Sequence, residues 1–166
     1  MIVETTEFAS PLGKITLATH EGRLCALCFT EGFTRTRRAL KRRFGAVEVR
    51  PMDGTADVVR QLRRYFDGDI AALGGIAVDP GGTVFQRKVW AALRRVPPGK
   101  TVSYRDLARS IGSPAAARAV GAANDANPIG IVIPCHRAIG ADGRLVGYAW
   151  GVNRKEWLLN HERQAP

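Results

Sequence analysis

The chain has 166 residues, enough for one compact unit or two small packed domains with a real core. No run of about 18 apolar residues occurs, which excludes a membrane span at the level of the sequence. The formal net charge of +10 favours a polyanion such as DNA as the partner, because each Lys or Arg that neutralises a phosphate releases counterions.

The N-terminus and the cysteines bear on the compartment. The segment Met1–Glu7 lacks the basic start and the apolar stretch of a secretory signal. Three cysteines, an odd number, argue against a disulfide framework and for a reducing compartment in which a thiolate survives. We therefore expect a cytoplasmic protein.

The first part of the chain predicts strands followed by helices. Residues 13–19 and 23–29 alternate as half-buried strands do, and Glu21-Gly22 between them indicates a hairpin. Two amphipathic helices are expected near 33–44 and 55–66.

Turn residues in 74–82 then interrupt the periodicity, so a domain boundary is expected there. This predicts an α/β domain over 1–78 and a second domain over 79–166.

Two features of the first part could be functional. Basic residues crowd the first expected helix, at Arg35, Arg37, Arg38, Lys41, Arg42 and Arg43. A solvated helix face explains them at least as well as a DNA contact, so they place no site. Cys25 and Cys28 form a C-x-x-C pair, but residues three apart in a strand point to opposite faces, which argues against a shared metal ion. No metal is expected.

Helix signals follow in the second part. Thr83-Val-Phe-Gln86 has the form of a capping box that opens a helix through Leu93. After an extended piece at 101–103, Ser103 caps a helix that ends near Gly112. Ser113 as N-cap and Pro114 at the first helical position predict a further helix over 114–124.

This order is typical of a helix-turn-helix module. The second helix is nearly bare, with small residues such as Ala116 and Ala117, a single bulky apolar residue at Val120, and Arg118 projecting. A small-residue helix packed on a neighbour would have the same composition.

The run Ile129-Gly-Ile-Val-Ile-Pro-Cys-His-Arg137 carries a candidate nucleophile. We expect a short apolar strand that Pro134 terminates, because proline has no N–H to donate. Cys135 would then lie at its end, where neighbouring positive charge, Arg137 included, lowers the pKa of the thiol. A buried structural cysteine is the alternative.

A helix near the C-terminus, with a cap expected at Asn153, brings a carboxylate inward. Glu162 follows Leu158 by four residues and Leu159 by three, so it shares their apolar face. A carboxylate held inward is costly unless paired, and a histidine is the obvious partner.

The motifs together resemble the O6-alkylguanine-DNA alkyltransferase family. The resemblance is carried, over about half the chain, by Phe85-Gln86-Arg87-Lys88-Val89-Trp90, Ser103-Tyr104, Ala116-Ala117-Arg118, Asn127-Pro128, Pro134-Cys135-His136-Arg137, Gly147-Tyr148 and Lys155-Glu156-Trp157. It implies an α/β (α+β) fold, with a small antiparallel-sheet-plus-helix domain followed by a mostly helical, winged-helix-like domain. It also implies no cofactor, no obligate protein partner and one irreversible alkyl transfer per molecule.

The resemblance implies roles for six residues in the chemistry. Glu162 orients His136, which acts through a water on the nucleophile Cys135. Tyr148 serves the leaving guanine with Lys155 nearby, and Asn127 pins the turn beneath the active-site strand.

It also implies double-stranded DNA containing O6-alkylguanine as the partner, approached from the minor groove, with O4-alkylthymine as a further expected substrate. The target base leaves the stack. Arg118 fills the space, Tyr104 crowds the 3′ phosphate of the lesion, and Ser103, Ala116 and Ala117 belong to the same DNA-binding motifs.

Two departures from the family lie at Ala149-Trp150 and Asp125. Many members have two small residues after the tyrosine, so we expect Trp150, beside Ala149, to wall the pocket and to slow reaction with large O6 substituents. Asp125, just past the recognition helix, is expected to weaken a phosphate contact.

Two other classes of protein fit some of these features. A regulatory or lesion-recognition helix-turn-helix protein without chemistry would be expected to have lost Cys135. A cysteine hydrolase would need an oxyanion hole and a cleft, which the sequence does not reveal.

Overall fold

The computed structural model describes residues 1–52, 57–145 and 147–164. They form two compact units, one of Met1–Gly81 with Pro128–Gly130 and the other of Gly82–Asn127 with Ile131–Pro166. Within the described residues, no helix is long and apolar enough to cross a membrane.

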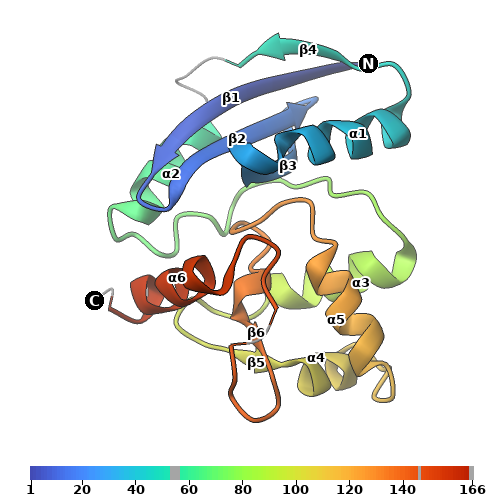
Figure 1. Ribbon diagram of the computed structural model, residues 1–166, viewed down its shortest axis with the longest axis vertical. Helices are drawn as coiled ribbons and strands as arrows, with labels where there is room; N and C mark the ends of the chain where they lie inside the picture. The colour runs from blue at the N-terminus through green and yellow to red at the C-terminus, as the bar shows by residue number, and fades with distance from the viewer. Residues whose placement is uncertain (53–56, 146, 165–166) are drawn as a thin grey trace. The chain divides into compact units, whose positions relative to one another are not determined.

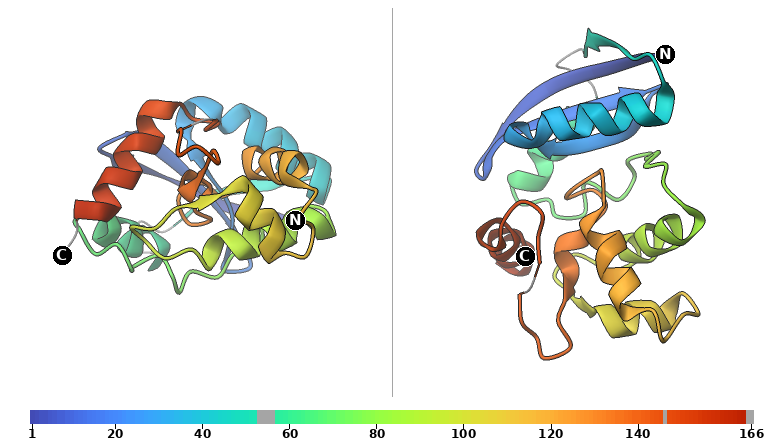
Figure 2. Two further views of the ribbon diagram at one scale, coloured as in Figure 1. Left: turned by 90° about the horizontal axis from the view of Figure 1, so that it is seen from below. Right: turned by 45° about the vertical axis from the view of Figure 1, so that its right-hand side comes forward.

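In the described part of the N-terminal unit, a four-stranded sheet is accompanied by two α-helices (Figures 1 and 2). Its elements are β1 (Ile2–Ser10), β2 (Gly13–His20), β3 (Arg23–Phe29), the 3₁₀ turn η1 (Thr30–Gly32), α1 (Phe33–Phe44), β4 (Glu48–Pro51) and α2 (Asp57–Phe66). The predicted hairpin and the helix over 33–44 are confirmed. The second predicted helix is present from Asp57, and residues 55–56 of that prediction lie outside the described part of the chain.

The sheet is mixed rather than purely antiparallel. Its order is β3-β2-β1-β4, in which the β1–β4 pair is parallel and the other two pairs are antiparallel. The sequence predicted an antiparallel sheet with strands over 13–19 and 23–29, and it did not predict β1 or β4. Because α1 carries the chain back between β3 and β4, β4 runs in the direction of β3, which is also the direction of β1.

A β-bulge in β3 changes the orientation of the two N-terminal cysteines. The pairing with β2 shifts register between Ala18 and Thr19, which leaves Cys25 without a partner position. Cys25 is buried in a cluster with Leu40 of α1, and Cys28 hydrogen-bonds Thr36 of the same helix. The argument that they face opposite ways is therefore wrong, because a bulge breaks the two-residue period.

The C-terminal unit is mostly helical. Its elements are α3 (Val84–Arg94), β5 (Val102–Ser103), α4 (Tyr104–Ser110), α5 (Ala117–Asp125), the 3₁₀ helix η2 (Cys135–Arg137), β6 (Ala138–Ile139) and α6 (Val152–Gln164). The capping box of Thr83 and Gln86 and the Ser103 cap are both formed as predicted. α3 also contacts α5, and the indole N–H of Trp90 donates to the Ala123 carbonyl at 2.8 Å.

Two helix starts differ from the prediction. α5 begins at Ala117, three residues later than expected, because Ser113–Ala116 forms a turn in which the Ala116 N–H donates to the Ser113 carbonyl. α6 begins at Val152, so Asn153 is its second residue and not its cap. Gly151, directly before it, has a φ of +101°, and its N–H donates to the Tyr148 carbonyl to close a turn.

The expected apolar strand over 129–133 is wrong. Ile129 makes one isolated bridge with Leu27, and the chain then turns at Ile131, which has a φ of +67°. The apolar residues Ile131, Val132 and Ile133 are buried all the same. A short buried apolar run looks like a strand in sequence even when it is a buried turn.

Candidate active site

Cys135 is the first residue of η2 and is 5% exposed. Burial raises the pKa of its thiol to about 11, although a hydrogen bond from Asn127 and the charge of Lys155 oppose this shift. The expected lowering of the pKa is therefore wrong for the protein without DNA. Desolvation of the thiolate outweighs the nearby positive charge.

Asn127 supports the turn that presents Cys135. Its side-chain Nδ2 donates to the Ile133 carbonyl at 2.9 Å, and its side chain also hydrogen-bonds the Cys135 thiol. The amide is buried. One side chain thus ties both the backbone and the sulfur to the end of α5.

Glu162 on α6 holds two side chains of η2. Its Oε2 lies 2.9 Å from His136 Nε2 and 3.0 Å from Arg137 Nη2, and its Oε1 lies 2.8 Å from Arg137 Nε. Burial favours the neutral acid, but the hydrogen bonds of His136 and Arg137 and the charge of the Arg137 guanidinium outweigh it and hold the pKa of Glu162 well below its usual value. Glu162 stays ionised whether or not His136 is protonated, because the guanidinium of Arg137 stays charged.

His136 is buried beside Cys135 with one ring nitrogen bound to Glu162. Burial lowers its pKa, more than the Glu162 carboxylate raises it, so the neutral ring is the form present at pH 7. A carboxylate only accepts hydrogen bonds, so Nε2 carries the proton and Nδ1 carries the lone pair. Nδ1 is buried and, among the described residues, has no hydrogen-bond partner.

Tyr148 and Lys155 are also buried in this unit. Burial raises the pKa of Tyr148 well above its usual value, and the nearby charge of a Cys135 thiolate raises it further. The Tyr148 hydroxyl has no partner among the described residues. Lys155 Nζ donates to the carbonyls of Ala138 at 2.5 Å and Gly147 at 3.2 Å, and burial lowers its pKa. Lys155 thus ties the backbone of Ala138 to that of Gly147 and places positive charge near Cys135.

The predicted DNA-binding residues lie on α4 and α5. Ser103 caps α4, Tyr104 is its first residue, and Arg118 is exposed near the start of α5. Burial raises the pKa of Tyr104 to about 12, with the charges of Asp125 and Cys135 adding to the shift. Tyr104 is therefore close enough to Cys135 and Asp125 for their charges to act on it, whereas Arg118 is exposed to solvent.

The structure places the remaining predicted residues around this arrangement. Ala116 is the N-cap of α5 and Ala117 its first residue, and both are partly exposed. Ala149 is exposed and Trp150 half-buried, directly after Tyr148. Asp125, at the end of α5, affects the pKa of Cys135, Tyr104 and Lys155 by its charge.

Sequence reasoning missed the main role of Arg137. Its guanidinium binds Glu162 through Nε and Nη2, and its Nη1 donates to the Val96 carbonyl at 2.7 Å. The sequence did contain a signal for this role. An arginine stands next to the expected histidine, and arginine characteristically pairs with a buried carboxylate through two parallel hydrogen bonds.

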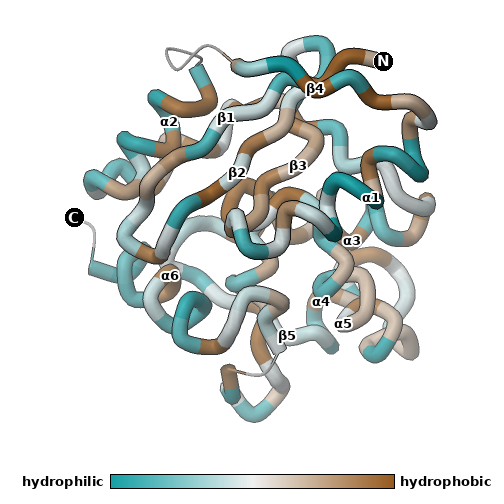
Figure 3. Tube along the Cα trace, turned by 45° about the horizontal axis from the view of Figure 1, so that its top comes forward, coloured by the Kyte–Doolittle hydropathy of each residue, from teal (hydrophilic) through white to brown (hydrophobic). Residues whose placement is uncertain are grey.

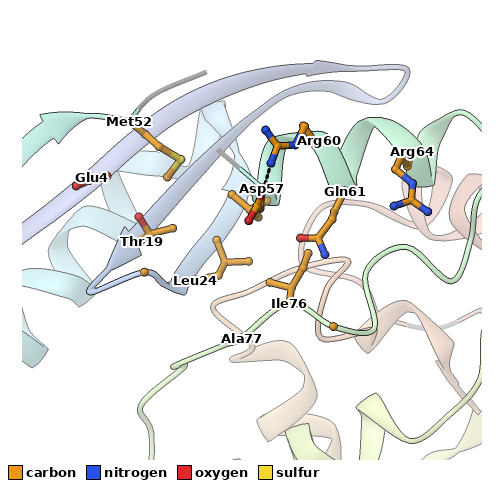
Figure 4. A pocket seen from close by; sticks show the side chains of 13 residues that line it. Glu4, Thr19, Leu24, Met52, Asp57, Arg60, Gln61, Arg64, Ile76 and Ala77 are labelled. Carbon is orange, nitrogen blue, oxygen red and sulfur yellow. Dashed lines mark hydrogen bonds and ion pairs between the residues drawn. The ribbon is translucent and has the colours of Figure 1, made fainter. Parts of the chain in front are cut away.

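A separate hollow of about 710 Å³ lies in the N-terminal unit and contains none of the predicted site residues. Thr19, Leu24, Met52 and Ile76 line it, and so do Arg60 and Asp57, which form an ion pair (Figure 4). Within the described part of the chain, no cluster of three or more His, Cys, Asp or Glu side chains is placed to hold a metal ion.

Two family models match the chain. Residues 3–80 match the ribonuclease-like domain of 6-O-methylguanine DNA methyltransferase, and residues 84–164 match its DNA binding domain.

Individual proteins agree with this. A methylated-DNA–protein-cysteine methyltransferase of Salmonella typhimurium is 58% identical over 102 residues, which cover 61% of this chain and 60% of the relative. One from Methanosarcina acetivorans is 41% identical over 93% of this chain and 95% of the relative. The crystal structure of Mycobacterium tuberculosis OGT in complex with DNA is similar with a TM-score of 0.80 and 40% identity, covering 99% of this chain and 94% of that one.

Proposed function

This chain belongs to the 6-O-methylguanine DNA methyltransferase family, and on that premise we propose that it repairs DNA by moving the alkyl group of O6-alkylguanine to its own Cys135. The observation that carries the proposal is the set of contacts around η2. Asn127 hydrogen-bonds the Cys135 thiol, and the neighbouring His136 is held by Glu162 with its basic nitrogen unengaged among the described residues.

DNA is bound through the helix-turn-helix of α4 and α5. The small residues of α5 permit a close approach to the minor groove, where base readout is largely degenerate and suits a search for lesions rather than for a sequence. The target base rotates out of the stack, Arg118 occupies the space, and Tyr104 crowds the 3′ phosphate. An alkylated guanine pairs poorly, so it unstacks at lower cost than a normal base.

The transfer starts with removal of the thiol proton. His136 accepts it on Nδ1 through a water, and the Cys135 sulfur attacks the alkyl carbon. The sulfur–carbon bond forms as the bond from carbon to O6 breaks, and the electron pair passes to O6. The hydrogen bond from Asn127 and the charge of Lys155 oppose the high pKa that burial gives the thiol.

Tyr148 donates a proton to the departing guanine, with Lys155 Nζ hydrogen-bonded to the neighbouring Gly147 carbonyl. The proton that His136 accepted from the thiol then passes through water to restore the Tyr148 hydroxyl, so the protons balance. The product is a thioether, and the acid–base groups of the site cannot cleave its new sulfur–carbon bond to regenerate the thiol. One chain therefore accepts one alkyl group. The substrate is O6-alkylguanine, and O4-alkylthymine is a second substrate class.

The two parts of the chain divide the work. We assign residues 79–166 to DNA binding and transfer and residues 1–78 to a supporting role, with the reaction taking place in the cytoplasm, where thiols stay reduced.

The test is the stoichiometry of transfer. Excess duplex carrying labelled O6-methylguanine is incubated with the native protein and with Cys135→Ala, and intact-protein mass and bound label are measured. One methyl group per native chain, constant with time and absent from the variant, supports the proposal. Tight lesion-selective binding without transfer would indicate a recognition protein, and continued turnover would indicate a hydrolase.

A further inference from the structure

The helix α1 carries an unusual concentration of positive charge. Between Glu31 and Glu48 the sequence contains no acidic residue, and α1 itself contains six basic ones. Arg43 is engaged, because its Nη2 lies 2.6 Å from Asp79 Oδ1 and its Nη1 donates to the Asp79 carbonyl. The other five are exposed, and among the described residues none of them has an ion pair: Arg35, Arg37, Arg38, Lys41 and Arg42.

These side chains form a stripe along the helix. Arg35, Arg38 and Arg42 are spaced by three and four residues, so they lie on one face, and Lys41 flanks them. The buried residue Leu40 lies on the face that packs on the sheet. Much of α1 has the colour of hydrophilic residues in Figure 3. At about 1.5 Å of rise per residue, the stripe is roughly 10 Å long.

The stability of α1 does not account for this arrangement. Cations in the last turn of a helix interact favourably with its dipole, which explains Lys41, Arg42 and Arg43. Arg35 and Arg38 lie in the first half, where the dipole opposes them. The stripe also places like charges three or four residues apart, which destabilises a helix.

Other basic residues of this unit are arranged differently. Lys14, Arg50, Arg60 and Arg64 are each paired with an acidic side chain, Glu7, Glu48, Asp57 and Asp69 respectively. The unit therefore contains carboxylates that neutralise other surface cations, yet among the described residues no carboxylate pairs with the α1 stripe. Unneutralised charge concentrated on one surface is the electrostatic pattern of a polyanion-binding face.

We propose that the α1 stripe, Arg35, Arg38, Lys41 and Arg42, is a second DNA-binding surface that contacts the phosphates of duplex DNA independently of sequence and of the lesion. Duplex DNA carries about one charge per 1.7 Å along its axis, so a stripe of this length faces roughly six phosphate charges. The surface goes beyond the proposed repair chemistry, because it recognises undamaged DNA and uses no residue of the Cys135 site. Its effect is to hold the protein on DNA between lesions.

The experiment compares two variants that lose the same charge. In the stripe variant, Arg35, Arg38, Lys41 and Arg42 become Gln; in the control, Lys14, Arg50, Arg60 and Arg64 become Gln. Each set comprises one Lys and three Arg, all exposed. Affinity for an undamaged duplex is measured by fluorescence anisotropy over a series of salt concentrations, and thermal unfolding and transfer from a free O6-alkylguanine base are measured in parallel.

The expected result is a change specific to the stripe. The slope of log K against log salt becomes shallower by about 0.9 for each phosphate that the protein no longer neutralises, so by roughly 2 to 4 in the stripe variant and by less than about 1 in the control. Transfer from the free base stays as in the native protein, which separates this test from that of the proposed function.

Three outcomes would overturn the proposal. Unchanged binding by the stripe variant would show that α1 does not contact DNA. An equal loss in both variants would show an effect of net charge alone. Salt-sensitive self-association in sedimentation velocity, lost in the stripe variant while DNA binding is kept, would identify a second copy of the chain as the occupant. Should the stripe variant not fold, Arg35→Gln with Arg38→Gln repeats the test, with Arg60→Gln and Arg64→Gln as its control.

Discussion

Arg137 and Glu162 form a two-point ion pair inside the C-terminal unit, with Arg137 Nε 2.8 Å from Oε1 and Nη2 3.0 Å from Oε2. The carboxylate side chain is fully buried, and it also binds His136. The arginine thereby keeps Glu162 ionised, and the ionised carboxylate fixes the tautomer of the histidine. Arg137 thus acts on its neighbour His136 through the Glu162 carboxylate of α6.

Arg137→Ala is expected to destabilise the protein by about 3–5 kcal/mol, because it leaves a buried carboxylate without its cation. Arg144→Ala is the matched control. Arg144 pairs with Asp142 at an exposed position, and such pairs contribute at most about 1 kcal/mol. Urea unfolding of both variants measures the difference. A loss below about 1 kcal/mol for Arg137→Ala would show that His136 alone compensates Glu162.

The free protein is expected to react slowly with iodoacetamide at Cys135 at neutral pH. Burial raises the pKa of an acid whose charged form is the thiolate, so at pH 7 the thiolate fraction falls about a hundredfold when the pKa moves from 9.0 to about 11. The rate should rise about tenfold per pH unit up to roughly pH 10. Peptide mass analysis over a pH series measures it at this residue. A rate that is already constant between pH 7 and 8 would contradict the raised pKa.

Arg118→Ala is expected to slow transfer from duplex DNA by about tenfold or more, because in the proposed mechanism this side chain fills the space that the extruded base leaves in the stack. Transfer from a free O6-alkylguanine base should be unchanged, since no base needs to leave a stack. Single-turnover kinetics on both substrates separate the two. Arg63→Ala, at an exposed position of α2, serves as the control of equal charge. Equal slowing on both substrates would instead place Arg118 in the chemistry.

Trp150→Gly is expected to increase the rate of inactivation by O6-benzylguanine relative to the native protein. The half-buried indole follows Tyr148 directly, and a bulky rim restricts a large substituent more than a methyl group. The rate with O6-methylguanine should change less. Both rates are obtained from the loss of methyl-accepting activity with time. Equal benzyl rates in the two proteins would show that Trp150 does not wall the pocket.

Local patterns in the sequence determined the elements whose signals are local. The hairpin around Glu21-Gly22, the helix over 33–44, the capping box at Thr83 and the Ser103 cap were predictable, because each depends on side chains within a few residues of one another. The position of Glu162 on the inner face of α6 followed from helical spacing in the same way.

Only the tertiary structure decided the features that depend on distant residues. The strand expected at 129–133 is a buried turn, which the side chain of Asn127 braces at the Ile133 carbonyl. The pKa of Cys135 rises because the folded chain removes water from the thiol, a cost that nearby charges in the sequence do not reveal. The pairing of Arg137 with Glu162 spans 25 residues, and only packing of α6 against η2 brings the two groups together.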